Sequence, residues 1–231
     1  MRFSSRRFNS VHIVSFCQRK YLLDYVIIGA VMCAPHPTLN RKSLYNTFMP
    51  NYRRVKIKGG TYFLTLVTYD RRKLFSSSET RQLLLDSIEH VRKYHSFSMD
   101  AFCILPDHGH FLWRMPEDDD NFSMRIAEIK KRFSKCYLKA VGEKQTVNPS
   151  QIKWGESGLW QRRFWEHYIR NEKDLNRHID YIHYNPVKHG LVKSVRDWSS
   201  SSFFDYVQIG IYEINWGRGY LNDDGKFKFG E

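Results

Sequence analysis

The sequence has few cysteines and no hydrophobic run long enough to cross a membrane. Its four cysteines, at positions 17, 33, 103 and 136, show no CxxC spacing, so we expect buried free thiols in a reducing compartment. The most apolar segment, residues 21–34, is short and is interrupted by Asp24, which excludes a membrane-spanning helix there. Internal repeats and low-complexity tracts are also missing from the sequence. We therefore expect a globular protein with no membrane partner.

Acidic residues are fewer than basic ones in this sequence. The 231 residues include 37 Lys and Arg against 24 Asp and Glu, which gives a net charge of +13 and a pI of about 9.6. Such an excess favours a polyanionic partner, and nucleic acid fits better than a membrane surface because the basic residues are scattered among aromatic ones. The alternative is a merely basic soluble protein. The 42% hydrophobic content is enough for a sizeable core in one domain, with or without an extension.

Residues 1–48 differ in composition from the remainder. A basic, serine-containing stretch precedes the apolar segment, an arrangement that is similar to a secretory signal peptide. The alternative, which we favour, is that these residues are a dispensable extension. It would result from a start codon assigned too far upstream, and Met49 would then be the true start. We expect the domain to occupy residues 49–231, and a nucleic-acid-binding protein of this kind to be cytoplasmic and nucleoid-associated, with no protein partner inferred.

The periodicity after residue 51 predicts alternating strands and helices. Residues 61–68, 97–105 and 108–115 are predicted strands, and 154–169 holds a further one. A helix begins at a capping box formed by Ser76 and Glu79 and runs to about residue 95, and others cover 122–141 and 171–190. Residues 142–150 are a predicted loop and 191–219 an irregular aromatic tail. The order β-α-β-β-α-β-α predicts a ferredoxin-like α+β domain, an antiparallel sheet with helices packed mainly on one face.

The predicted helix 171–190 carries two neighbouring arcs of side chains. Asn171 is placed to cap its start, whereas Pro186 and Gly190 close its end. At about 100° per residue, one arc is apolar and buried, and the arc beside it is polar. The apolar arc holds Leu175, Ile179 and Ile182, and the polar arc holds Asp174, His178, Tyr181 and Asn185. Tyr181 and Asn185 are therefore placed to share one site; the alternative is a partly buried tyrosine whose hydroxyl is hydrogen-bonded.

His108 and His110 begin a predicted strand. Residues i and i+2 of a strand point to the same face, so both imidazoles could reach one metal ion. A third ligand is needed, and either Asn185 or His178 could supply it. The alternative is a pair of structural histidines.

Basic side chains gather at two further places. The predicted helix 122–141 carries a basic run on its exposed sides, and residues 160–165 place two arginines among aromatic rings, which suits phosphate and base contacts. These candidate DNA-binding residues are Lys130, Lys131, Arg132, Lys135, Arg162 and Arg163. The alternatives are a solvated helix face and, for the tryptophans, core packing, which we favour.

The chain resembles the REP-associated tyrosine transposases, a branch of the single-tyrosine HUH (IS200-like) transposases. LPDHGHFLWRMPEDDDNFSMRIAEIKKRF (residues 105–133) and GLWQRRFWEHYIRNEKDLNRHIDYIHYNPVKHGLV (158–192) carry the resemblance, and GGTYFLT (59–65) matches the family's first strand. It covers residues 52–216 approximately. Residues 1–48 lie outside it.

The resemblance implies a metal-dependent endonuclease and strand transferase that acts on single-stranded DNA at hairpins of repetitive extragenic palindromes. It makes His108 and His110 the metal-binding pair, Tyr181 the nucleophile and Asn185 the third ligand, with Mg²⁺ or Mn²⁺ as the ion. His178 could assist as a base. One residue departs from the family: Gly109 stands where a bulky hydrophobic residue is usual. Two other classes remain open, a hairpin-binding module that no longer cuts and a metal-dependent hydrolase of another phosphodiester.

Overall fold

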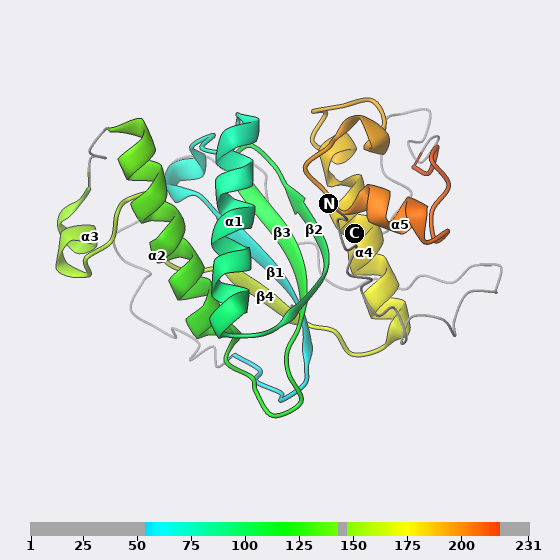
Figure 1. The fold of residues 1–231 in the computed structure, drawn as a ribbon, viewed down its shortest axis with the longest axis horizontal. Helices are drawn as coiled ribbons and strands as arrows, with labels where there is room; N and C mark the ends of the chain where they lie inside the picture. The colour runs from blue at the N-terminus through cyan, green and yellow to red at the C-terminus, as the bar shows by residue number, and fades with distance from the viewer. Residues whose placement is uncertain (1–53, 143–146, 218–231) are drawn as a thin grey trace, which may run out of the picture. The chain divides into compact units, whose positions relative to one another are not determined.

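The computed structural model describes residues 54–142 and 147–217, and the element order within them is shown in Figure 1. The extension expected at residues 1–48 lies outside the described residues. Among the helices of the described part, none has the length and apolar character needed to cross a membrane.

Four strands form one antiparallel sheet in the order β2-β3-β1-β4. Their bounds are Thr61–Val67 for β1, Ser98–Ile104 for β2, His108–Arg114 for β3 and Trp165–Tyr168 for β4. β3 pairs with both β2 and β1, and β1 pairs with β4. The antiparallel α+β fold predicted from the sequence is confirmed. The fourth strand is much shorter than the segment predicted to contain it.

Two long helices cover one face of this sheet. α1 (Ser78–Tyr94) and α2 (Phe122–Val141) pack against each other and over the strands (Figure 1). Alternate residues of β1 face them, because successive side chains of a strand point to opposite faces. Tyr62, Leu64 and Leu66 are fully buried there, together with apolar residues of both helices. The side chains between them, such as Phe63, are thereby committed to the other face.

α4 (Glu172–Lys188) contacts β2 and β3 and lies on that other face. As predicted, Asn171 caps its start, since the Asn171 side chain accepts from the backbone N–H of Asp174 at 2.9 Å. The prediction that Pro186 closes the helix is wrong, because Pro186 lies inside the last turn. Gly190, with φ of +66°, ends it: its N–H bonds to the Val187 carbonyl and that of Leu191 to the Pro186 carbonyl.

Several short elements escaped the sequence analysis. They are the 3₁₀ turns η1 (Tyr69–Arg71) and η2 (Val195–Asp197) and the helices α3 (Pro149–Lys153) and α5 (Phe203–Gln208). α3 begins inside the predicted loop, where Asn148 and Gln151 form a capping box. α5 lies in the aromatic tail. The predicted cap of α1 is off by one residue: Ser77, not Ser76, accepts from the N–H of Thr80.

Candidate active site

β3 places His108 and His110 on the sheet face that carries α4. Both side chains are buried, with 5% and 4% of their surface exposed, and their ring centroids lie 4.9 Å apart. Gly109 between them pairs with Leu66 and faces the α1–α2 side. A Cβ on Gly109 would lie 2.8 Å from two ring carbons of Phe111, so the Phe111 ring occupies the space that a side chain at position 109 would need.

Each of the two histidines has a partner that fixes its ring. The Nδ1–H of His108 donates to the Asp107 carboxylate at 2.5 Å, and His110 Nδ1 lies 2.9 Å from Thr65 Oγ1. A proton held on Nδ1 leaves Nε2 with the lone pair that a metal ion needs. His110 Nε2 is buried and has no hydrogen-bond partner among the described residues. The pair is therefore oriented as metal-ligating histidines are.

Asn185 supplies a second buried acceptor that is left unpaired. Its Nδ2 donates to the Tyr181 carbonyl at 3.1 Å, whereas its Oδ1 has no partner in the part of the chain that the structure describes. Burial lowers the pKa of His110 well below its usual value, and His108 and His189 lower it further. A weak contact with the Asn185 side chain, which does not reach normal hydrogen-bond geometry, raises it in part. The His110 ring is thus neutral, as a metal ligand has to be. An orphaned imidazole nitrogen and an orphaned amide oxygen fit a divalent cation.

The Tyr181 ring lies beside this pair. Its centroid is 5.3 Å from that of His110 and 5.8 Å from that of Phe63, and Tyr181 is 39% exposed, so substrate can reach it. The Lys188 ammonium lies 5.1 Å from the ring centroid, on the same helix. A cation over the ring face is attracted by the negative face of the ring, so this contact holds the Tyr181 ring in place.

The other tyrosines near α4 are placed differently. Tyr184 is 2% exposed and its ring packs against Trp216 of the tail. The Tyr168 ring packs against Tyr62, which belongs to the α1–α2 face of the sheet. Neither tyrosine is therefore beside the histidine pair.

His178 lies one turn before Tyr181 and contacts the same Phe63 ring, at 4.8 Å between centroids. Its Nδ1–H donates to the Asp174 carbonyl at 2.8 Å, which leaves Nε2 as the basic atom. Burial is the main cause that lowers the pKa of His178, so the ring is neutral near pH 7. His178 is thus in the right protonation state for a base.

The candidate DNA-binding residues do not gather around Tyr181. α2, with Lys131, Arg132 and Lys135, covers the opposite face of the sheet, so DNA that touches both must pass around an edge. Lys130 is partly buried, contrary to the predicted exposed side. Its ammonium donates to the Gln161 carbonyl at 2.8 Å, and burial lowers its pKa to about 8.

Arg162 and Arg163 line a surface cavity of about 330 Å³ next to α3. Arg163 is exposed, whereas Arg162 is bound to Glu156 at 2.5 Å and to Ser150 at 3.0 Å. Of the two, Arg163 is the better placed to contact DNA.

Several residues around the site were missed by the sequence analysis. His189 follows α4, and its ring centroid lies 5.3 Å from that of His108. Asp107 and Thr65 orient the histidine pair. His189 could have been suspected, since it lies four residues after Asn185 and thus one helical turn further on. Thr65 could not, because its role depends on the register of β1 against β3.

Comparison with known proteins settles the family. A family model described as "Transposase IS200 like" matches residues 56–185, more than half of the chain. This chain belongs to the IS200-like transposase family. Its members are enzymes that act on DNA. An Escherichia coli REP-associated tyrosine transposase is 43% identical over 169 residues, which cover 73% of this chain and 91% of that protein.

Two further likenesses point to the same branch of the IS200-like transposases. A Haemophilus influenzae protein assigned to the REP-associated tyrosine transposases is 47% identical over 183 residues, 78% of this chain and 98% of that protein. A solved structure of a REP-associated tyrosine transposase bound to a REP hairpin has a TM-score of 0.62 at 42% identity, and covers 79% of this chain and 98% of that one. The present chain is therefore a REP-associated tyrosine transposase by family.

Proposed function

We propose that this transposase cuts and rejoins single-stranded DNA at REP-type hairpins through a 5′-phosphotyrosine intermediate. The observation that carries the proposal is the pair of orphaned buried acceptors, His110 Nε2 and Asn185 Oδ1, beside the exposed Tyr181 ring. The solved relative bound to a REP hairpin supports the choice of substrate. A DNA substrate also implies a cytoplasmic, nucleoid-associated protein.

His108, His110 and Asn185 would hold the metal ion. Mg²⁺ or Mn²⁺ bound there would polarise the scissile phosphate and stabilise charge on its oxygens. The Asp107 carboxylate and the Thr65 hydroxyl keep both imidazoles oriented, so ligand geometry does not depend on the ion alone.

The reaction itself would be carried by Tyr181. Its hydroxyl oxygen forms a bond to phosphorus as the bond to the 3′-oxygen breaks, and the freed strand leaves with a 3′-hydroxyl. The phenolic proton passes to a base, for which His178 Nε2 is the proposed acceptor, and the departing oxygen gains a proton in turn. A second 3′-hydroxyl that attacks the phosphotyrosine would reverse these steps and join strands.

Basic side chains would contribute binding rather than chemistry. Lys131, Arg132, Lys135 and Arg163 are placed to neutralise phosphates, with Arg162 and Lys130 engaged internally. Because each neutralised phosphate releases condensed counterions, hairpin affinity should fall steeply as salt rises.

The test is a covalent adduct. A hairpin oligonucleotide labelled 3′ of the cut is incubated with Mn²⁺ and the full chain, and a labelled band that survives denaturant is sought. We expect the band with the wild type and with Tyr184→Phe and Tyr168→Phe, and its loss with Tyr181→Phe, which should still bind the hairpin.

Any other result of this experiment would support a different interpretation. Hairpin binding without any adduct would leave a binding module that no longer cuts. Cleavage without an adduct would indicate a metal-dependent hydrolase in which Tyr181 only positions substrate. An adduct that persists in Tyr181→Phe would refute the assignment of the nucleophile.

A further inference from the structure

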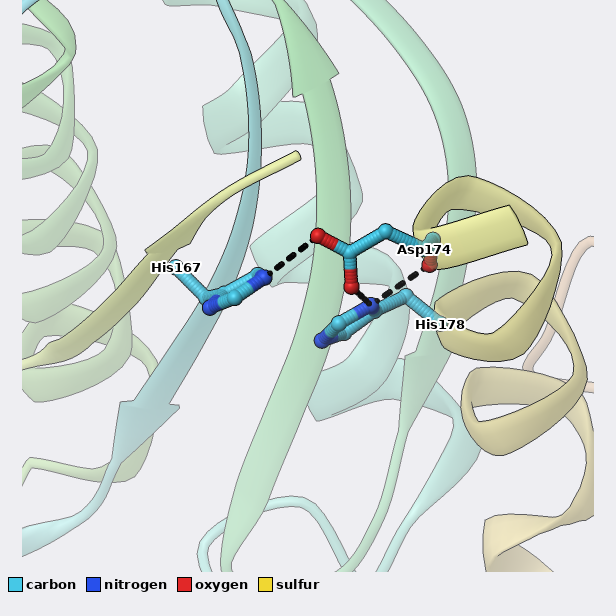
Figure 2. Close-up of side chains that lie close together, drawn as sticks. All are labelled: His167, Asp174 and His178. Atoms are coloured by element: carbon cyan, nitrogen blue, oxygen red, sulfur yellow. Dashed lines mark hydrogen bonds and ion pairs between the residues drawn. The ribbon is translucent and has the colours of Figure 1, made fainter. Parts of the chain in front are cut away.

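We propose that His167, Asp174 and His178 form a second metal site, for a zinc-type divalent ion, between β4 and α4. Figure 2 shows the three side chains pointing toward one another, His167 from the strand and the other two from the helix. No ligand of the His108–His110–Asn185 site takes part. The inference therefore concerns an ion additional to the one proposed for catalysis.

The polar atoms of the three side chains lie close together. His167 Nε2 lies 2.9 Å from Asp174 Oδ2, and His178 Nδ1 lies 3.3 Å from Asp174 Oδ1. One ligand atom from each of the three residues falls within 4.8 Å of the other two. Bonds of about 2.0–2.1 Å in a tetrahedron place neighbouring ligands roughly 3.3 Å apart. Because the two imidazoles are stacked, one ring must turn before both direct a lone pair at the same ion.

The backbone holds these side chains in place. Asp174 and His178 are four residues apart on α4, a spacing that puts both on one side of a helix. The Asn171 cap fixes the backbone at Asp174. The His167 ring stacks on that of His178 at 4.6 Å and on that of Trp165 at 6.0 Å. The backbone positions of the three residues are therefore set before an ion binds, and only an imidazole ring has to reorient.

Solvent can reach the site from one side. His167 lines a surface cavity of about 260 Å³ with Val55, Glu166, Tyr168 and Arg170. The Asp174 side chain is 9% exposed, whereas that of His167 is 26% exposed. Three protein ligands with an open fourth position for water make up the arrangement of non-structural zinc sites.

Several hydrogen bonds compete with the ion. Asp174 Oδ2 accepts from the backbone N–H of Arg170 at 3.1 Å and from the Nε2–H of His167 at 2.9 Å, so the His167 proton must move to Nδ1 before Nε2 can bind an ion. Arg170 Nε donates to Asp174 Oδ2 at 3.1 Å, and the Nδ1–H of His178 donates to the Asp174 carbonyl. The Arg170 side chain is 67% exposed and can turn to solvent, and the Nδ1 proton would be released to water. A metal on Nδ1 leaves the His178 proton on Nε2. The metal and the proposed base role of His178 therefore exclude each other.

The donor set selects the ion. Imidazole nitrogen with a single carboxylate suits Zn²⁺ or Co²⁺, whereas Mg²⁺ prefers oxygen ligands and retains its waters. Co²⁺ is a useful probe, since its visible absorption reports tetrahedral coordination.

The test is binding of Zn²⁺ and Co²⁺ alone to the full chain that carries His108→Ala and His110→Ala, followed by calorimetry and by Co²⁺ absorption. On this background we expect one tetrahedral ion. Adding His167→Ala should weaken binding by more than roughly 100-fold, because the loss of an outer-shell partner alone costs about 10–100-fold. Asp174→Asn, which keeps side-chain volume, should do the same. His90→Ala, at a half-buried histidine of α1 on the other face of the sheet, is the matched control and should change nothing.

Arg170→Met separates an ion site from a hydrogen-bond network. Removing a competing charge near Asp174 should tighten binding roughly fivefold, as expected for a unit charge about 4 Å away in water. A purely structural network would lose a bond and gain no affinity. Unchanged binding in His167→Ala, or no binding on the starting background, would overturn the proposal. The adduct at Tyr181 is measured separately, with Mn²⁺ and without Zn²⁺ or Co²⁺, so failure of this proposal and failure of the proposed function are distinguishable.

Discussion

The contact between Gly109 and Phe111 predicts that an alanine at position 109 destabilises the protein although it removes a glycine from a strand. Its Cβ would lie 2.8 Å from two Phe111 ring carbons, well inside ordinary contact distance. Overpacking of this kind costs about 1–3 kcal/mol, whereas replacement of a strand glycine by alanine gains about 0.5–1 kcal/mol. The free energy of unfolding should therefore fall, by up to roughly 2.5 kcal/mol, in Gly109→Ala.

The sign should reverse once the ring is removed. Phe111 is fully buried, and Phe111→Leu should cost less than the roughly 3–5 kcal/mol typical of Phe→Ala in a core. On the Phe111→Leu background the clash is relieved. Gly109→Ala should then stabilise by about 0.5–1 kcal/mol.

The assay is urea unfolding of the full chain followed by tryptophan fluorescence, for the wild type, both single variants and the double variant. The coupling energy between the two positions should be about 1–3 kcal/mol. Additivity within roughly 0.5 kcal/mol, or a stabilising Gly109→Ala in the wild type, would show that the ring does not fill the place of the missing side chain.

Two further predictions concern the metal and the pH. Chelator should abolish adduct formation, Mg²⁺ or Mn²⁺ should restore it, and the His108→Ala, His110→Ala double variant should not respond; undiminished cleavage by that variant would remove the histidines from the metal site. Burial lowers the pKa of His183 to about 3, so below about pH 6.5 the unfolded chain takes up a proton that the folded chain excludes. The free energy of unfolding should therefore fall as the pH drops from 6.5 to 4.5. In His183→Gln the slope of this free energy against pH, measured by urea unfolding, should be smaller by about 1.4 kcal/mol per pH unit. An unchanged slope would contradict the assignment of the effect to His183.

The sequence was informative wherever one periodicity decided the structure. The strand-forming residues of 61–68, and the break at Pro106 and Asp107 before 108–115, are enough to predict two strands, and the i, i+2 spacing places His108 and His110 on one face because a strand has only two sides. The same holds for Tyr181 and Asn185, whose shared arc follows from helical spacing alone. The start of α4 could be predicted from Asn171, because an asparagine side chain at that position suits an N-cap.

What the sequence left undetermined depends on long-range contacts. Whether Lys130 is exposed depends on where residues 160–164 cross α2, and no local pattern records that. His167 meets Asp174 only because β4 is short and the chain turns directly into α4. The Ser77 cap was misplaced because three consecutive serines offer nearly equal caps.

All the proposed catalytic groups belong to one polypeptide, since α4 folds back onto β2 and β3 of its own sheet. Two inactive variants should consequently not complement each other. A chain that lacks the histidine pair and a chain that lacks the Tyr181 hydroxyl should remain inactive when mixed. For the same reason the rate per molecule of the first cut should not rise with protein concentration. Catalytic competence is, on this arrangement, a property of the folded monomer.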